Sequence, residues 1–290
     1  MKKGISYLIL LITVLCLVGC ESNWLTREPM PSETDRPLTE QELAYAATWR
    51  PDYDYGTCRD LRGEVSVVLF YLDDFESSWT AEEIERFTKN EVLPGLAFLE
   101  KEAKKYGVDL TLTVRRTYSD IVYPDEVIVS VKQTGSATFN VLKKTASALR
   151  YSSDLKMIEA FRSEFGTDEV VCFTLFNKNG TAYAINPKRG SDTQAQEHCI
   201  VFAYDLGSDR HDPTGSQASI VAHEMLHLFG AEDFYATPSR KALATKQYPS
   251  DLMLGAHYDV RTNRIGDATA FYIGWTDKIP EILREEDWQK

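Results

Sequence analysis

The chain has 290 residues, of which 43% are hydrophobic and 11% are aromatic. That composition provides enough apolar side chains for a full core and does not indicate disorder across the body of the chain. The formal net charge of −12 argues against nucleic acid as a partner and against a basic contact with anionic lipids.

The N-terminus has the pattern of a secretory signal peptide over residues 1–19. Lys2 and Lys3 precede an apolar run that closes with Gly19 and Cys20. The run is shorter than the ~20 residues that span a bilayer, so we do not expect a transmembrane helix. Its ending resembles a bacterial lipobox, in which the cysteine, here Cys20, is acylated and becomes the first mature residue. The pattern predicts an extracytoplasmic protein of the bacterial cell envelope, held to a membrane by lipid on Cys20.

Residues 20–62 are predicted to be a tether and lead-in to a single globular domain over residues 63–290. The stretch from Glu21 to Pro37 is polar and contains prolines, which favours an extended linker. Thr39 precedes Glu42 at capping-box spacing, which predicts a short helix.

Three further cysteines lie in the predicted mature chain: Cys58, Cys172 and Cys199. Their odd number allows at most one disulfide bond among them, and the sequence does not decide the pairing. Cys172 and Cys199 both lie in strand-like apolar runs, which favours buried thiols.

The domain begins with a β-α-β pattern. Residues Glu64–Leu72 are β-branched and aromatic, which predicts the first strand. A long amphipathic helix is expected from Thr80 to Lys105, with a kink at Pro94. Val108–Val114 alternates in polarity and predicts a second strand, parallel to the first.

The middle of the domain predicts a mixture of elements. A short strand is expected at Glu126–Val131, a helical stretch between about Thr138 and Phe165, and a strand at Glu169–Leu175. Asn177–Gly180 is typical of a turn, and Thr181–Asn186 is expected to follow as the partner strand of a hairpin.

Two elements complete this part of the chain. Cys199–Tyr204 predicts another strand. A helix is expected to start near Thr214 or Ser216, and apolar residues such as Val221 and Met225 should bury it in the domain.

This helix carries His223-Glu224-Met225-Leu226-His227. Residues four apart lie on one face of a helix, so His223 and His227 can bind a single metal ion, with Glu224 beside them. Gly230 falls where a helix commonly ends in a left-handed residue, which turns the chain back and can bring Asp233 toward the same ion. The pattern predicts a metal site with a carboxylate next to it.

These residues resemble the zinc signature of the metzincin clan of metalloendopeptidases, H-E-x-x-H-x-x-G-x-x-H/D. Asp233 stands where most of the clan carries a histidine, a variant similar to that of the snapalysin-type proteases. The resemblance implies one zinc ion per chain, bound by His223, His227 and Asp233, and its spacing selects Asp233 over the neighbouring Glu232. It also implies that Met253, the only methionine after the motif, lies in a tight Met-turn beneath the metal.

The resemblance further implies an α+β, zincin-like fold: a twisted mixed sheet with long helices, and a small, mostly irregular C-terminal subdomain with the Met-turn and a final helix, here Asp267–Trp275. Thr181–Asn186 is the candidate for an antiparallel edge strand that pairs with an extended substrate, and an ordinary hairpin edge is the alternative. Some clan members place a tyrosine ligand two residues after the methionine. Here that position is Gly255, and Tyr258 is the nearest substitute.

The implied function is a zinc-dependent endopeptidase that acts on protein or peptide substrates outside the cytoplasm, with Glu224 as the general base that activates a metal-bound water. One alternative is a lipid-anchored, non-catalytic binding or adhesion protein on the same scaffold, against which the intact Glu224 argues. Another is a distant glutamate as third ligand, for which the chain offers Glu281, Glu285 and Glu286 only near its end.

Other reactive side chains have no motif partners. A role for Cys58 or Asp52 in capping the zinc of a latent form lacks a matching local motif. His198, His211 and His257 are expected to be surface or structural histidines.

Overall fold

The computed structural model describes residues 39–48, 57–124, 140–186, 196–205, 217–255 and 259–289. The predicted signal peptide, Cys20 and the strand expected at Glu126–Val131 lie outside the described residues. The body of the chain is an α+β unit built on a five-stranded mixed sheet.

The sheet has the strand order β2-β1-β3-β5-β4. The strands are β1 (Gly63–Asp73), β2 (Leu110–Val122), β3 (Glu169–Gly180), β4 (Tyr183–Ile185) and β5 (His198–Asp205). β1 pairs in parallel with β2 and β3, and β3 pairs in parallel with β5, whereas β4 runs antiparallel to β5. The predicted parallel β-α-β start is therefore confirmed, and β2 is longer than its alternating segment predicts.

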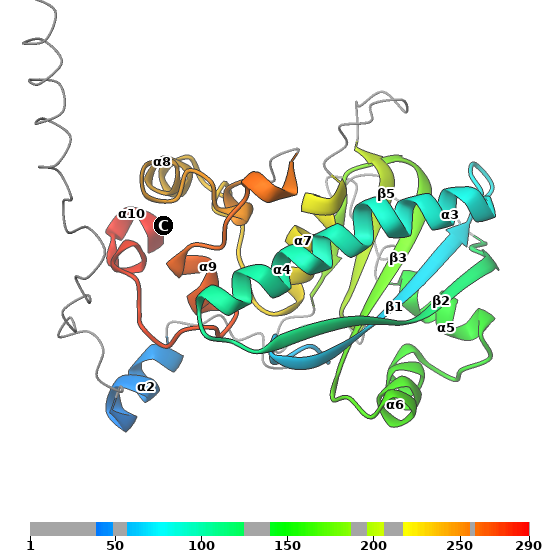
Figure 1. The fold of residues 1–290 in the computed structure, drawn as a ribbon, viewed down its shortest axis with the longest axis horizontal. Helices are drawn as coiled ribbons and strands as arrows, with labels where there is room; N and C mark the ends of the chain where they lie inside the picture. The colour runs from blue at the N-terminus through cyan, green and yellow to red at the C-terminus, as the bar shows by residue number, and fades with distance from the viewer. Residues whose placement is uncertain are drawn as a thin grey trace, which may run out of the picture. The chain divides into compact units, whose positions relative to one another are not determined.

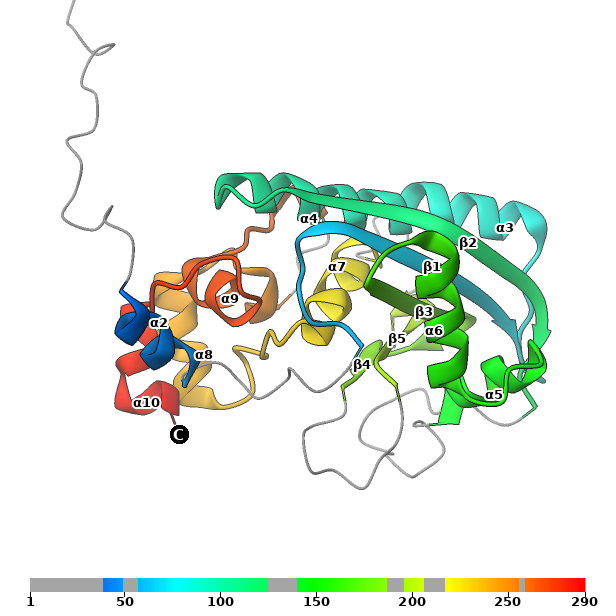
Figure 2. The same ribbon diagram turned by 90° about the horizontal axis from the view of Figure 1, so that it is seen from below.

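Helices cover both faces of the sheet (Figure 1, Figure 2). One face is covered by α3 (Ala81–Phe87), α4 (Leu93–Lys105) and α7 (Gln217–Leu228), and the other by α5 (Val141–Ala148) and α6 (Asp154–Phe165). β1 is buried on both sides because its side chains alternate: Val67 and Leu69 join the core with α4 and α7, and Val68 and Phe70 join the core with α5 and α6.

The helix predicted from Thr80 to Lys105 is present, with an interruption. Thr80 caps α3 through a capping box with Glu83. Thr88–Val92 then forms a π-helical segment directly before α4, whose first turn contains Pro94. Pro94 has no N–H to donate to the preceding turn, which accounts for the change in hydrogen bonding just before it, and the kink expected at Pro94 stays a prediction.

The turn predicted at Asn177–Gly180 is wrong, because these residues continue β3. Their polar side chains have distant partners: Asn177 Nδ2 donates to Ser78 O at 2.7 Å, and Lys178 Nζ lies 2.6 Å from Asp74 Oδ2. These tertiary contacts outweigh the local preference for a turn.

The antiparallel edge strand expected before β5 is confirmed, but its partner is not the preceding strand. β4 pairs with β5, with Ala184 opposite Cys199. The predicted hairpin with the strand at Glu169–Leu175 is wrong, because β5 lies between β3 and β4 in the sheet.

The described part of the helical stretch expected between Thr138 and Phe165 consists of two helices. Arg150 adopts a φ of 67° between them, which ends α5. Ser153 then caps α6 by accepting a hydrogen bond from Lys156 N at 3.1 Å.

The C-terminal part contains more helix than the sequence patterns predict. The sequence patterns do not predict α8 (Pro238–Gln247), although Thr237-Pro238 is a typical helix start. The helix expected over Asp267–Trp275 is α9 (Asp267–Tyr272), which is shorter. It is also not the final helix, because α10 (Glu286–Gln289) follows it.

The N-terminal lead-in contributes to the body. α2 (Glu40–Ala47) confirms the short predicted helix, and Ala46 is buried. Leu61 and Cys58 are also buried in the core. Cys58, Cys172 and Cys199 are free, buried thiols, which the sequence context favours for Cys172 and Cys199.

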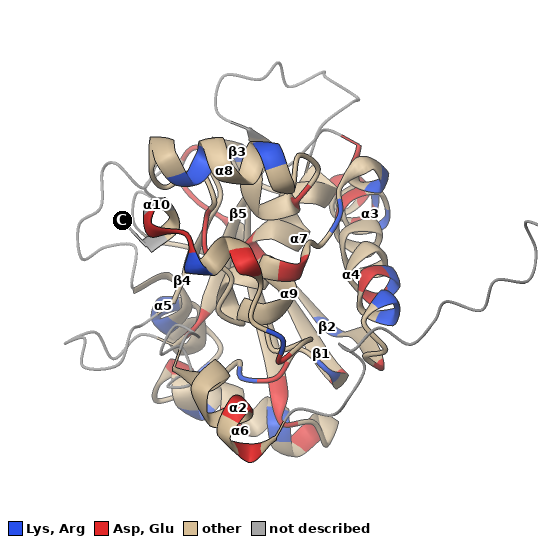
Figure 3. Ribbon diagram, turned by 90° about the vertical axis from the view of Figure 1, so that its left-hand side faces the viewer, with Lys and Arg blue, Asp and Glu red and all other residues tan. Residues whose placement is uncertain are grey.

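Charged side chains of both signs are interspersed along the surface helices α3 and α4 (Figure 3). In α4, for example, Lys105 Nζ lies 2.6 Å from Glu102 Oε1. Among the described residues, none of the helices is both long enough and apolar enough to cross a bilayer.

Candidate metal centre

Helix α7 presents the predicted metal-binding face. His223 and His227 emerge on the same side, with 4.8 Å between their ring centroids. Apolar residues of the helix such as Met225 are fully buried, which fixes its orientation. Its N-terminal end is also fixed, because Glu91 Oε2 accepts a hydrogen bond from Ala218 N at 3.0 Å.

Three side-chain atoms converge at the C-terminal end of α7. His223 Nε2 lies 3.2 Å from His227 Nε2, and Asp233 Oδ1 lies 3.2 Å and 3.3 Å from these two nitrogens. Gly230 has a φ of 99° just beyond the helix, which lets the chain turn back toward the histidines as its spacing predicts. The structure therefore brings together the three residues predicted as ligands.

The hydrogen bonds of the two rings indicate which nitrogens carry protons. His223 Nδ1 lies 3.1 Å from Leu252 O, and His227 Nδ1 lies 2.8 Å from Ala231 O. A carbonyl oxygen only accepts, so each Nδ1 is the donor, and the Nε2 atom of each ring is the one that faces the cluster. Asp233 Oδ1 is buried and accepts no hydrogen bond from the described residues. Three electron-pair donors this close to one another need a cation among them.

A zinc ion fits this set of donors. Two imidazole nitrogens and a carboxylate oxygen make up the three protein ligands of one type of catalytic zinc site, which keeps a further position open. The ligand atoms of His223, His227 and Asp233 all lie within 4.8 Å of one another. Backbone carbonyls that accept from the opposite ring nitrogens are the usual means of orienting histidine ligands.

The charges of the cluster favour a cation. Burial lowers the pKa of His227, but the Asp233 and Glu224 carboxylates outweigh it and raise that pKa to about 9. Burial acts to raise the pKa of Asp233, yet the two histidines hold it well below its usual range. A proton and a metal ion therefore compete for the same position.

Glu224 projects from α7 toward the edge strand. It is 5% exposed, and its carboxylate lies next to the backbone N–H of Ala184 in β4, which acts to lower its pKa. Burial raises the pKa of Glu224, and the charges of His223 and His227 oppose that rise. Asn186 also ties this strand end to the helix, because its Nδ2 donates to His227 O at 2.6 Å. A buried carboxylate with a raised pKa suits proton transfer.

Met253 is fully buried in a tight 3-10 turn. The residue before it, Leu252, supplies the carbonyl that accepts from His223 Nδ1. Met253 O accepts a hydrogen bond from Phe234 N at 2.8 Å, which joins the turn to the segment that carries Asp233. The tight turn expected at Met253 is therefore present and contacts both ligand segments.

Tyr235 is a residue of the site that the sequence patterns miss. Its side chain is 44% exposed, and its ring stacks on that of His223, with 6.4 Å between centroids and 12° between planes. Partial burial and the Asp233 charge raise the pKa of Tyr235 well above its usual range, so its hydroxyl keeps its proton. The position expected for a tyrosine ligand is occupied by Gly255, and Tyr258 lies outside the described residues.

Other predicted candidates lie apart from the cluster. Glu232 Oε2 is 2.8 Å from Arg240 Nη1, so this carboxylate is engaged elsewhere. The Cys58 thiol donates to Val170 O at 3.6 Å and is not in the cluster, which gives no support to a latency role. His198 is fully buried, and burial lowers its pKa to about 4, so it is a structural histidine.

The alternative glutamate ligands are exposed and lie outside the cluster: Glu281, Glu285 and Glu286. The remaining candidates, Asp52, His211 and His257, lie outside the described residues.

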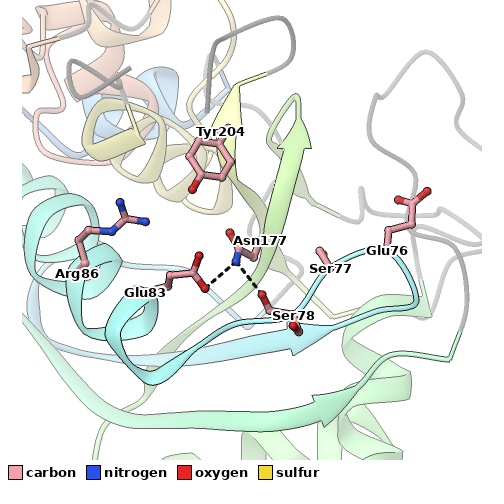
Figure 4. A pocket seen from close by; sticks show the side chains of 7 residues that line it. All are labelled: Glu76, Ser77, Ser78, Glu83, Arg86, Asn177 and Tyr204. Atoms are coloured by element: carbon pink, nitrogen blue, oxygen red, sulfur yellow. Dashed lines mark hydrogen bonds between the residues drawn. The ribbon is translucent and has the colours of Figure 1, made fainter. Parts of the chain in front are cut away.

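A hollow of about 480 Å³ lies beside the C-terminal ends of β1, β3 and β5 (Figure 4). Its lining is mostly polar, and Asn177 Nδ2 bridges Ser78 O at 2.7 Å and Glu83 Oε2 at 3.0 Å. His223, His227 and Asp233 do not line it, so it is separate from the candidate metal centre.

Comparison with models of protein families finds no match to this chain, and comparison with curated protein sequences finds none either.

Proposed function

We propose that this protein is a zinc-dependent endopeptidase with a zincin-like fold of the metzincin type. The observation that carries the proposal is the convergence of His223 Nε2, His227 Nε2 and Asp233 Oδ1 within 3.2 Å to 3.3 Å of one another. The mixed sheet, the antiparallel edge strand and the tight turn at Met253 are compatible with such a fold.

The proposed reaction is hydrolysis of a peptide bond by water. Zinc, when bound, would supply the Lewis acidity that makes water a better nucleophile and polarises a peptide carbonyl. Glu224 takes a proton from the attacking water and passes it to the departing amine. The protonated Tyr235 hydroxyl, which lies beside Asp233, turns to donate a hydrogen bond to the carbonyl oxygen as negative charge develops on it.

The outer edge of β4 is the proposed place for the substrate. Tyr183 and Ile185 of this strand are buried, whereas Ala184 between them is partly exposed. Among the described strands β4 pairs only with β5, and an extended peptide would pair with its other edge. A peptide paired there would run past Glu224, because the Glu224 carboxylate lies next to Ala184 of this strand.

The alternative is a binding or adhesion protein on the same scaffold. Such a protein needs a structural metal but no carboxylate beside it, and burying a carboxylate costs free energy. The burial of Glu224 next to the ligand pair therefore favours the enzyme. Attachment to a membrane through Cys20 rests on the signal-peptide pattern alone and stays a prediction.

The proposal is tested by Glu224→Gln in an assay that follows cleavage of a broad peptide library. We expect loss of cleavage by ~10²–10⁴-fold, because general-base assistance is worth about that much, with zinc content unchanged. Glu197→Gln is the matched control, because Glu197 is also buried but is bonded to Thr57 and Cys58, outside the metal cluster. Equal cleavage by wild type and Glu224→Gln would overturn the mechanism, and loss of zinc would make Glu224 a ligand.

A further inference from the structure

The two neighbours of Asp233 in the chain both contact residues outside the metal cluster. On one side, Glu232 Oε2 lies 2.8 Å from Arg240 Nη1. On the other, the buried ring of Phe234 packs edge-on against Trp288, with 4.9 Å between centroids and 69° between planes. The third ligand is thus held between two contacts that both lead to the C-terminal part of the chain.

Arg240 and Trp288 are themselves joined, which closes a ring of contacts around Asp233. Arg240 Nε and Nη2 donate to Trp288 O at 3.3 Å and 3.1 Å, and the guanidinium carbon lies 5.3 Å from the centre of the indole ring. Trp288 is 2% exposed, and its Nε1 donates to the Tyr272 hydroxyl at 3.0 Å. We name this set of four residues, Glu232, Phe234, Arg240 and Trp288, the C-terminal clamp.

The segment that carries Asp233 is tied to α7 at its start, where Ala231 N donates to Leu226 O at 3.1 Å and Ala231 O accepts from His227 Nδ1 at 2.8 Å. Residues 231–233 belong to no helix or strand, and they follow Gly230, whose φ of 99° is a conformation that favours glycine. The backbone bond from Phe234 N to Met253 O, at 2.8 Å, holds the segment from one direction. The C-terminal clamp holds it through side chains from the other.

We propose that Trp288 and Arg240 are positioning residues for Asp233, so that the last described helix, α10, sets the affinity of the site for its metal ion. The inference rests on the proposed zinc site and extends it. The Arg240 and Glu232 side chains are only 16% and 29% exposed, so their ion pair is better shielded from solvent than an ordinary surface pair. Neither Trp288 nor Arg240 touches the ligand atoms, so any effect on the metal must pass through the clamp.

The test uses Trp288→Leu in the full chain, with Trp275→Leu as the matched control. Both indoles are almost fully buried, at 2% and 5% exposure, and each donates one hydrogen bond, to the Tyr272 hydroxyl and to Leu61 O. The two variants should therefore lose similar stability. We expect only Trp288→Leu to weaken zinc binding, by ~10–100-fold in competition with a chelator, as for other residues that orient metal ligands.

Hydrogen exchange of the Phe234 amide in metal-free protein is the second readout, and it does not depend on zinc binding. We expect faster exchange in Trp288→Leu than in Trp275→Leu. Trp288→Phe keeps a ring against Phe234 and should restore most of the zinc affinity. If Trp288→Leu does not fold, Arg240→Met removes the bonds to Glu232 and to Trp288 O and should give the same two effects more weakly.

The outcomes separate this inference from the proposed function. Equal losses of zinc affinity in Trp288→Leu and Trp275→Leu, or equal exchange rates at Phe234, would overturn the clamp as a positioning device. If the wild-type protein binds no zinc, the proposed function fails, and the exchange rate at Phe234 still decides whether the clamp holds the segment.

Discussion

Gly95→Ala tests how tightly α4 packs against α7, the helix that carries two of the proposed metal ligands. A Cβ atom at Gly95 would lie 2.6 Å from the backbone oxygen of Ala218 and 3.2 Å from Val221 Cβ, so the two helices would have to separate by several tenths of an ångström. A backbone oxygen cannot rotate away as a side chain can. Overpacking of a core destabilises a protein by about 1–3 kcal/mol, and a clash with a backbone atom should lie near about 3 kcal/mol. The better helix propensity of alanine stabilises the helix by about 1 kcal/mol. We therefore expect the free energy of unfolding to fall by about 2 kcal/mol.

The assay is thermal and urea unfolding of the metal-free protein, in which a loss of that size lowers Tm by about 4–8 °C. Ala97→Gly is the matched control. Ala97 is exposed in the same helix, so this substitution changes the helix propensity without changing the packing between helices. Zinc affinity should also fall in Gly95→Ala, since α7 must shift. If Gly95→Ala stabilises the protein by as much as Ala97→Gly destabilises it, the close packing of the two helices is refuted.

Three further outcomes are expected. Asp233→Ala should weaken zinc binding in chelator competition more than Glu232→Ala does, because only Asp233 approaches both histidines, and the reverse order would reassign the third ligand. Tyr235→Phe should lower kcat of peptide cleavage by ~10²–10³-fold with zinc content unchanged, as for loss of a donor to a developing oxyanion, and an unchanged kcat would remove the hydroxyl from the mechanism. Burial raises the pKa of Glu197 to about 7, so the folded state binds its proton more tightly than the unfolded state. The free energy of unfolding should therefore fall, by at most about 3 kcal/mol, as pH rises from about 4.5 to 7, and Glu197→Gln should flatten that slope in urea titrations.

The centre of the site follows from local rules, and for that reason the sequence predicts it well. Spacing by four puts His223 and His227 on one helix face in any tertiary environment. Gly230 adopts the positive φ that its position after the helix predicts. The approach of Asp233 is only partly local, because the bond from Phe234 N to Met253 O joins segments that spacing alone does not bring together.

The features that escaped prediction depend on contacts between distant residues. Asn177 and Lys178 have the composition of a turn, yet partners in the loop after β1 keep them in a strand. Tyr235 has no motif, and only its stacking on His223 reveals it. Trp288 has no sequence signal as a support for the third ligand, because its role depends on packing against Phe234. In contrast, α8 begins with a local signal, because Thr237 is a typical N-cap and Pro238 a typical first helical residue. The start of α8 is therefore predictable from the sequence.

A zinc titration of the metal-free protein, with peptide cleavage followed at each step, tests the central claim most directly. We expect cleavage to rise in proportion to added zinc and to level off at one equivalent per chain, because the described residues contain one cluster of three candidate ligands. Cleavage that persists after complete removal of metal, or one tightly bound equivalent of zinc with no cleavage of any peptide in a broad library, would contradict the account.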